Sequence, residues 1–222
     1  RSKGEIKKIM LSHSIKNFLT PEEVQWFIWY WDQRPVEVDD GGRFHSMAYY
    51  DQPFFANIRK KLDSKVPDDE YIKIVQISRD YLPGGVHSDG YIGEDSPEIG
   101  KLATSYLVPL VVSEPCYTLT FNNYSEKAVS LNEYAKLMYG IINYDEVGKE
   151  YFNLSAEPFD KDVHEKHLTH MDIKYLSGLK CDRANLWEVG SAITWPRAQL
   201  HCSANFSKEA TRIMMLILTC KR

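Results

Sequence analysis

The sequence predicts an α+β protein, mainly β, in which helices pack on a small antiparallel sandwich. Helix signals dominate the first part of the chain, and short β-branched segments separated by turns dominate it from Tyr71 onward. The chain has 222 residues, of which 43% are hydrophobic, so one domain can bury a sizeable core. That apolar content excludes a disordered tail.

The first 70 residues are expected to form a helical buttress. Thr20 can cap a helix that has Pro21 in its first turn and Glu23 three positions after the cap. This helix should continue to Trp31, and a second is expected from Gln52 to Leu62. The aromatic residues of the first helix indicate packing into the core, or alternatively the surface of a homodimer.

Strand candidates follow in the order expected of a sandwich. They are Tyr71–Ser78, Ala103–Val112, Tyr117–Phe121, Ser191–Trp195, Gln199–Ser203 and Arg212–Thr219. Pro109 favours an edge strand or a bulge, because proline cannot donate a hydrogen bond to a neighbouring strand. A polar, helix-leaning insertion at about 130–178 interrupts the region from residue 71 to residue 219.

Charge and cysteine content exclude several partners. The net charge of −4, from 27 basic and 31 acidic residues, indicates no nucleic-acid partner. The longest aliphatic run, Ile213 to Leu218, is far too short to span a bilayer, so no membrane is expected. Four cysteines without a CxxC pair favour a reducing cytoplasm and exclude a zinc ribbon.

A metal-binding pattern follows the first strand candidate. His87 and Asp89 are two residues apart, so in an extended segment both side chains point to one side. His201, on a later strand candidate, supplies a third ligand. Two histidines and one carboxylate form the facial triad of non-haem Fe(II) oxygenases, which leaves coordination positions open for substrate and dioxygen.

Arg212 is a candidate anion-binding residue. Residues 205–209 look like a hairpin loop, and a hairpin would bring Arg212 beside His201 across the ladder. Its guanidinium offers a planar fork that fits a carboxylate.

These residues carry a resemblance to a known family. His87-Ser88-Asp89, His201 and Arg212 look like the HxD…H…R pattern of the 2-oxoglutarate- and Fe(II)-dependent dioxygenases. The segments Arg79–His87 and Gly190–His201 also resemble the sequences that precede the first and last metal ligands in that family. The resemblance covers roughly residues 71–219. The stretch from Trp187 to Phe206 is similar to oxygenases of marine bacteria and their phages.

The resemblance implies a double-stranded β-helix (jelly roll, cupin-like) with iron at its open end. His87, Asp89 and His201 would bind Fe(II), and Arg212 would bind the cosubstrate 2-oxoglutarate. Gln76 and Tyr106 are weaker candidates for cosubstrate contacts. Met214 stands where many members have Ser or Thr, so Thr104 or Tyr106 would supply that hydroxyl.

The resemblance further implies an oxidoreductase that consumes dioxygen (O2) and converts 2-oxoglutarate to succinate and CO2. Because Asp89 is present, we expect hydroxylation rather than halogenation. A small-molecule substrate is favoured. The alternatives are a prolyl- or lysyl-type protein side-chain hydroxylase and a non-catalytic jelly-roll binding protein. By the same resemblance, the insertion at about 130–178 would form a lid over the active site or a wall of the substrate pocket.

Several other residues have simpler interpretations. His170 and Asp172 form a second HxD triplet, but too few residues separate it from His201 for the strands the fold needs. His164, His167 and His170 share one face of a possible helix without an obvious fourth ligand. Cys202 is expected to be a buried small residue, and Arg197 to form a surface or structural ion pair, with substrate binding as its alternative.

Overall fold

The computed structural model describes residues 12–33, 37–38, 43–47, 56–89, 91–92, 101–125, 129–130 and 154–222. Much of the predicted insertion, residues 131–153, therefore lies outside the described residues, as do residues 52–55 of the second expected helix.

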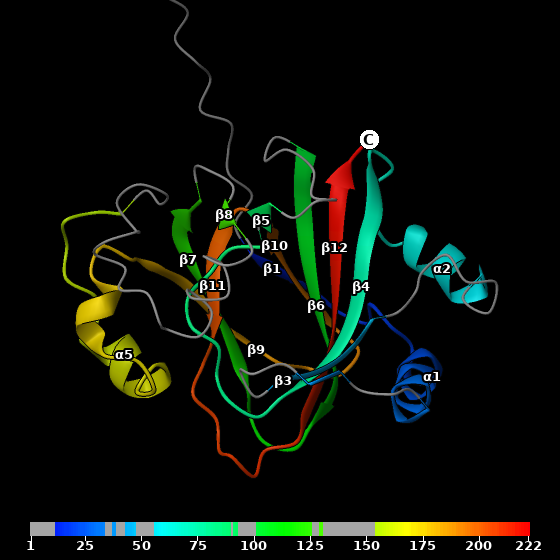
Figure 1. The fold of residues 1–222 in the computed structure, drawn as a ribbon, viewed down its shortest axis with the longest axis horizontal. Coiled ribbons are helices and arrows are strands. Elements are labelled where there is room, and N and C mark those ends of the chain that lie inside the picture. Colours follow the sequence, from blue (N-terminus) through cyan, green and yellow to red (C-terminus); the bar gives the residue numbers. More distant parts are fainter. Residues whose placement is uncertain are drawn as a thin grey trace, which may run out of the picture.

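One large sheet forms the centre of the molecule (Figure 1). Its strands, in spatial order, are β1 (His13–Ile15), β10 (Ala192–Pro196), β6 (Leu102–Val112), β12 (Arg212–Lys221), β4 (Glu70–Asp80), β3 (Arg43–Met47) and β2 (Glu37–Val38). All neighbours within it pair antiparallel. The expectation of helix and loop alone before residue 70 is wrong, because β1, β2 and β3 extend this sheet at both edges.

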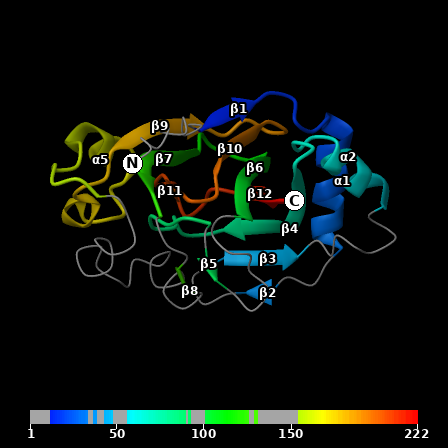
Figure 2. The same ribbon diagram turned by 90° about the horizontal axis from the view of Figure 1, so that it is seen from above.

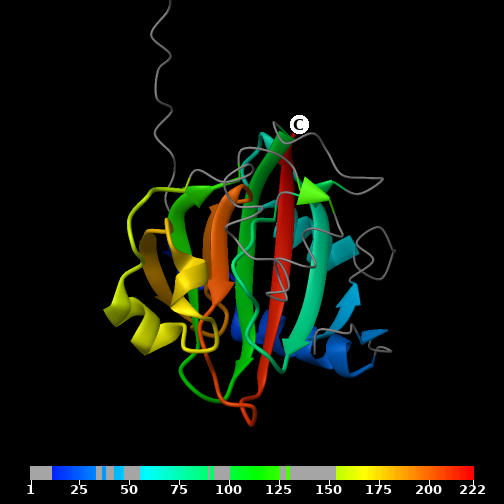
Figure 3. The ribbon, with the colours of Figure 1, turned by 60° about the vertical axis from the view of Figure 1, so that its left-hand side comes forward.

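A smaller sheet lies beside the large one and carries the order β11–β7–β9. These strands are β11 (Gln199–Ser203), β7 (Tyr117–Tyr124) and β9 (Cys181–Leu186). A further pair, β5 (Tyr91–Ile92) and β8 (Val129–Ser130), is parallel. Figure 3 shows the chain crossing from the small sheet to the large one between β11 and β12. The sequence did not predict strand β9, because its residues show no clear alternation of apolar and polar side chains.

Pro109 lies inside the large sheet rather than at its edge, because β6 is flanked by β10 and β12. The alternative expectation, a bulge, is confirmed. The β6–β12 register shifts between the pairs Ile213↔Val111 and Met214↔Pro109. The bulge accommodates the missing N–H of proline within a central strand.

Helices α1 (Pro21–Asp32) and α2 (Ala56–Asp63) lie beyond one face of the large sheet (Figure 2). The predicted capping box of α1 is present: the Glu23 N–H donates to the Thr20 side chain, and the Glu23 carboxylate accepts from the Thr20 N–H. Phe27 and Tyr30 are fully buried in one cluster with Met215 of β12, which confirms core packing. Trp29 is the exception, with 51% of its surface exposed.

The described part of the insertion covers the outer face of the small sheet. Helix α5 (Lys161–His167) and the 3₁₀ helix η3 (Ile173–Leu176) lie on the opposite side of the molecule from α1 (Figure 2). Phe159 and Leu176 pack in one buried cluster with Leu119 of β7 and Cys202 of β11. The expectation that Cys202 is a buried small residue is therefore confirmed. Residues 154–178 thus support the sheet from outside.

All four cysteines are free thiols. No helix in the described part of the chain is long and apolar enough to cross a membrane.

The cap of α1 can be tested by Thr20→Ala, which removes the hydroxyl that accepts the Glu23 N–H. Loss of an N-cap costs about 1 kcal/mol. For a protein of this size we expect thermal denaturation to show a fall in melting temperature of about 2–4 °C. Thr20→Ser retains the hydroxyl and should melt like the wild type; an equal fall in both variants would contradict a capping role.

Candidate metal centre

The two predicted histidine ligands are joined through their backbones. The His87 N–H donates to the His201 carbonyl at 2.9 Å, and the His201 N–H donates to the His87 carbonyl at 2.8 Å. Residues that exchange both hydrogen bonds in an antiparallel pair project their side chains to the same face. The imidazole ring centroids therefore lie 4.3 Å apart.

Both imidazoles are fixed in the tautomer that suits a metal. Nδ1 of His87 lies 2.8 Å from the carbonyl oxygen of Gly85, and Nδ1 of His201 lies 3.1 Å from that of Gln199. A carbonyl oxygen only accepts hydrogen bonds, so each Nδ1 carries the proton. In the neutral form of each ring, Nε2 then carries the lone pair that can bind a metal ion.

The Asp89 carboxylate is fixed from the large sheet. Its Oδ2 accepts hydrogen bonds from Ser105 Oγ at 2.5 Å and from Trp195 Nε1 at 3.1 Å. Burial raises the pKa of Asp89. Attraction to the charged forms of His201 and His87, the Ser105 hydrogen bond and the nearby Arg197 together lower that pKa below its ordinary value. The aspartate is consequently held in the ionised form that metals require.

The donor set fits a divalent metal. One ligand atom from each of His87, Asp89 and His201 lies within 4.8 Å of the others, and all three residues are buried. His201 Nε2 is 3.7 Å from Asp89 Oδ2, close to the spacing of about 3 Å between adjacent ligands of an octahedral ion with bonds near 2.1 Å. Three ligands on one side leave other coordination positions open. No second such group occurs among the described residues.

Arg212 reaches the same interior by a different route from the one expected. The predicted hairpin is wrong, because β12 pairs with β4 and β6 whereas β11 pairs with β7. The guanidinium is nonetheless buried, between the rings of Trp187 and Phe206, whose centroids are 4.1 and 4.2 Å from Cζ.

The residues that contact this guanidinium were missed by the sequence analysis. Its Nη2 lies 3.5 Å from Ser203 Oγ and 3.8 Å from Asp80 Oδ2. Ser203 is two positions after His201 on β11, so both face the same side, about 7 Å apart along the strand. The i, i+2 spacing was a signal that could have identified Ser203 as the hydroxyl near Arg212.

The two weaker cosubstrate candidates lie on opposite faces of the large sheet. Gln76 is four residues before Asp80 on β4, so it shares the face of β4 that meets Arg212. Tyr106 stacks on Phe18 in the cluster that includes α1, where burial raises its pKa to about 12. It is adjacent to Ser105 and points to the other side of β6. Thr104 shares that outer side and donates to Glu70. The structure does not bring Tyr106 or Thr104 to the metal centre.

The competing histidine patterns do not assemble a site. Asp172 caps η3 and pairs with Lys174 instead of facing His170. Burial lowers the pKa of His170 to about 4, so this imidazole is neutral. His164 Nε2 bonds the Met171 carbonyl. Arg197 is buried and hydrogen-bonded to backbone carbonyls, so the surface form of the expected ion pair is wrong.

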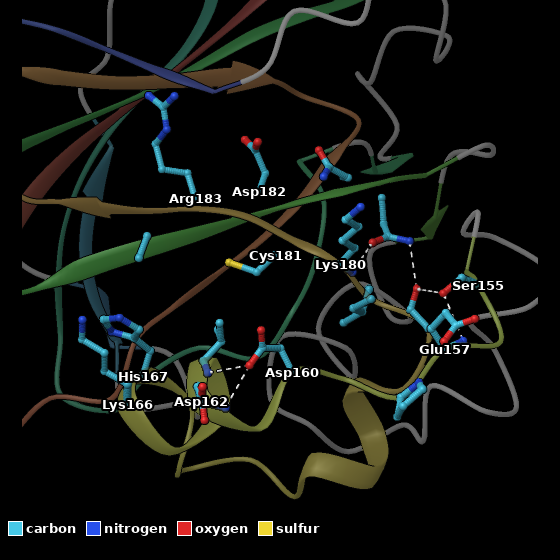
Figure 4. A pocket seen from close by; sticks show the side chains of 17 residues that line it. Ser155, Glu157, Asp160, Asp162, Lys166, His167, Lys180, Cys181, Asp182 and Arg183 are labelled. Atoms are coloured by element: carbon cyan, nitrogen blue, oxygen red, sulfur yellow. Dashed lines mark hydrogen bonds between the residues drawn. The ribbon is translucent and has the colours of Figure 1, made fainter.

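A separate hollow of about 900 Å³ lies between β9 and α5 (Figure 4). It is lined by residues 179–184 on one side and by Asp160, Asp162, Lys166 and His167 on the other. It contains none of the triad residues, and acidic and basic side chains alternate around it. It is therefore distinct from the metal centre.

Comparison with known proteins identifies the fold. No family model and no curated protein matches the sequence. Solved structures do match. HygX from Streptomyces hygroscopicus, with nickel and 2-oxoglutarate bound, has a TM-score of 0.54 at 11% identity, covering 95% of this chain and 82% of that one. The alpha-ketoglutarate-dependent carbocyclase SnoK from nogalamycin biosynthesis gives 0.53 at 10%, covering 95% and 79%.

A third similar structure is the viral collagen prolyl hydroxylase vCPH from Paramecium Bursaria Chlorella virus-1. Its TM-score is 0.51 at 14% identity, covering 96% of this chain and 90% of that one. Identities this low show shared architecture only. The chain therefore has the fold of the 2-oxoglutarate- and Fe(II)-dependent oxygenases, as the sequence resemblance predicted.

Proposed function

We propose that this protein is an Fe(II)- and 2-oxoglutarate-dependent dioxygenase that hydroxylates a small molecule. The observation that carries the proposal is the buried His87–Asp89–His201 group, with both Nε2 lone pairs available and Arg212 reaching the same interior. An oxygenase fold alone would be compatible with a binding protein. The intact donor set favours an enzyme.

The strand order supports a double-stranded β-helix as the architecture of this site. From β6 onward the chain visits the large sheet, then β7 and β9 of the small sheet, then β10, β11 and β12 in alternation. His87 adds to the small sheet through its bridge to β11. In such a winding, the proposed metal ligands of the small sheet would lie opposite Ser105 and Trp195 of the large one.

His87, Asp89 and His201 would hold the iron. When bound, Fe(II) with 2-oxoglutarate and dioxygen supplies the oxidation of a substrate C–H bond, with release of succinate and CO2. Hydrogen bonds from Ser105 and Trp195 would hold the Asp89 carboxylate in a fixed orientation toward the metal. Burial of all three ligands excludes bulk water from the protein side of the centre.

Arg212 and Ser203 would bind the distal carboxylate of 2-oxoglutarate. The guanidinium fork is held between two aromatic rings, which limits its movement. The spacing of about 7 Å between Ser203 and His201 along β11 suits a five-carbon dicarboxylate that spans from the metal to the arginine. Gln76, on the adjoining face of β4, is a further candidate contact.

A small-molecule substrate and a reducing cytoplasm complete the proposal. The net charge of −4 disfavours nucleic acid, and four free thiols fit a compartment that keeps iron ferrous. Mass spectrometry of a compound library incubated with enzyme, Fe(II), 2-oxoglutarate and oxygen should reveal a +16 Da product. A product from peptides alone would assign the protein instead to the side-chain hydroxylases.

Formation of the ternary complex tests the cofactor assignment directly. Anaerobic addition of Fe(II) and then 2-oxoglutarate should give the weak visible charge-transfer absorption that the family resemblance implies. Fe(II) alone, and Fe(II) with succinate, are the controls and should give none. Absence of the absorption with 2-oxoglutarate, in protein that remains folded by circular dichroism, contradicts the proposal.

The two HxD triplets can be separated by matched histidine variants. His87→Ala removes a ligand and should abolish the rise in melting temperature that Co(II) or Ni(II) produces by binding the folded state. His170→Ala should retain that rise, because Asp172 caps η3 and does not face His170. The opposite result would move the metal centre to the second triplet.

The role of Arg212 is tested by Arg212→Lys, which keeps the charge but loses the fork. Hydrogen bonds to charged groups are worth about 1.5–3 kcal/mol, so affinity for 2-oxoglutarate should fall by about 10- to 100-fold. Metal affinity should be unchanged, because Arg212 contacts none of the three ligands. Arg59→Lys, on exposed α2, is the control. Unchanged 2-oxoglutarate affinity in Arg212→Lys would assign cosubstrate binding elsewhere.

A further inference from the structure

Arg197 forms hydrogen bonds with both backbone groups of Asp89, its N–H and its carbonyl. Its Nη2 donates to the Asp89 carbonyl oxygen at 2.9 Å, and its own carbonyl accepts the Asp89 N–H at 2.9 Å. Both hydrogen-bonding groups of the Asp89 backbone are therefore satisfied by one residue.

The other end of the guanidinium is fixed to the large sheet. Nη1 donates to the carbonyl oxygen of Thr219 and to the Cys220 thiol, both at 3.3 Å on β12. The Arg197 N–H donates to the Ala103 carbonyl on β6 at 2.9 Å. Arg197 thus ties the loop that carries Asp89 to two central strands. Asp89 itself lies outside the named strands, so it has no ladder to hold it.

Burying this guanidinium is unfavourable because the charge loses its hydration, and no direct ion pair among the described residues offsets that loss. Only 2% of Arg197 is exposed. Within the described residues it forms no direct ion pair, although its charge lowers the pKa of Asp89, and its Nε has no hydrogen-bond partner. A buried cation without a paired carboxylate is unfavourable for stability. Its position beside Asp89, a proposed metal ligand, therefore points to a role at that residue.

We propose that Arg197 is a positioning residue of the metal centre. It fixes the Asp89 backbone, while Ser105 and Trp195 fix the carboxylate, so that the aspartate meets the metal in one orientation. Arg197 acts through Asp89 and does not contact the metal. This inference rests on the proposed function only in requiring that the triad binds a metal.

The test compares Arg197→Met, Arg197→Lys and the control Thr20→Ala. Methionine keeps much of the volume but removes every side-chain donor. Lysine keeps the charge but cannot span the Asp89 and Thr219 carbonyls at once. Thr20→Ala lowers stability by removing the cap of α1, and Thr20 has no hydrogen bond to Arg197 or Asp89.

Co(II) is the probe, because its affinity can be measured by anaerobic calorimetry and its visible spectrum reports its coordination. Loss of groups that orient a metal ligand typically costs 10- to 100-fold in metal affinity. We expect a loss of that size with an altered Co(II) spectrum in Arg197→Met, and a smaller loss in Arg197→Lys. Thr20→Ala should melt at a lower temperature yet bind Co(II) like the wild type.

Two results would overturn the inference. Wild-type affinity and spectrum in both Arg197 variants would show that Asp89 needs no such support. An equal loss of affinity in Thr20→Ala would show that Arg197 acts only through general stability. Failure of the proposed function would give a different result. If the wild-type protein binds Co(II) but shows no charge-transfer absorption with Fe(II) and 2-oxoglutarate, the proposed function fails, while the comparison of the Arg197 variants still holds. If the wild type binds no Co(II), both proposals fall.

Discussion

The backbone pair between His87 and His201 is the constraint on which the centre depends. Because the two residues exchange both hydrogen bonds, their separation is set by the main chain and not by flexible side chains. The side chains of His87 and His201 project to the same face only in this register. A one-residue slip of β11 on β7 would turn His201 outward and direct Leu200 or Cys202 into the interior. The apolar cluster beneath α5, which buries Leu200 and Cys202, therefore also protects the position of the ligand.

The centre needs both sheets at once. The histidines belong to the small sheet and its bridge, whereas the groups that hold Asp89 come from β6, β10 and the turn after β10. Trp195 links the two sides, since it donates to Asp89 and its ring lies 4.5 Å from that of His201. Any change in the spacing of the sheets would move the aspartate relative to the histidines. The bulge at Pro109 and the packing of α1 thus matter to the site as well as to stability.

The sequence was informative where the chemistry is local and uninformative where it depends on tertiary pairing. The spacing of His87 and Asp89 predicted a shared face, and Thr20 to Glu23 predicted the cap of α1. The partner strand of Arg212 was predicted wrongly, because a period of two identifies a strand but not the sheet it joins. Ser105 and the role of Arg197 could not be identified, since each acts through a residue distant in the sequence. The short strands β2 and β3 were missed because the pairing of β3 with β4, and of β2 with β3, outweighs their local signals.

The placement of Tyr106 shows why such errors recur. Ser105 and Tyr106 are neighbours on one strand, and a difference of one position separates the metal centre from the core under α1. The strand β6 is buried on both faces, so its sequence lacks the polar alternation that would distinguish them. A hydroxyl on either residue could have faced the interior. Only the pairing of β6 with β10 and β12 assigns Ser105 to Asp89 and Tyr106 to Phe18. In a doubly buried strand, therefore, the side that carries the chemistry is decided by the neighbouring strands and not by the strand itself.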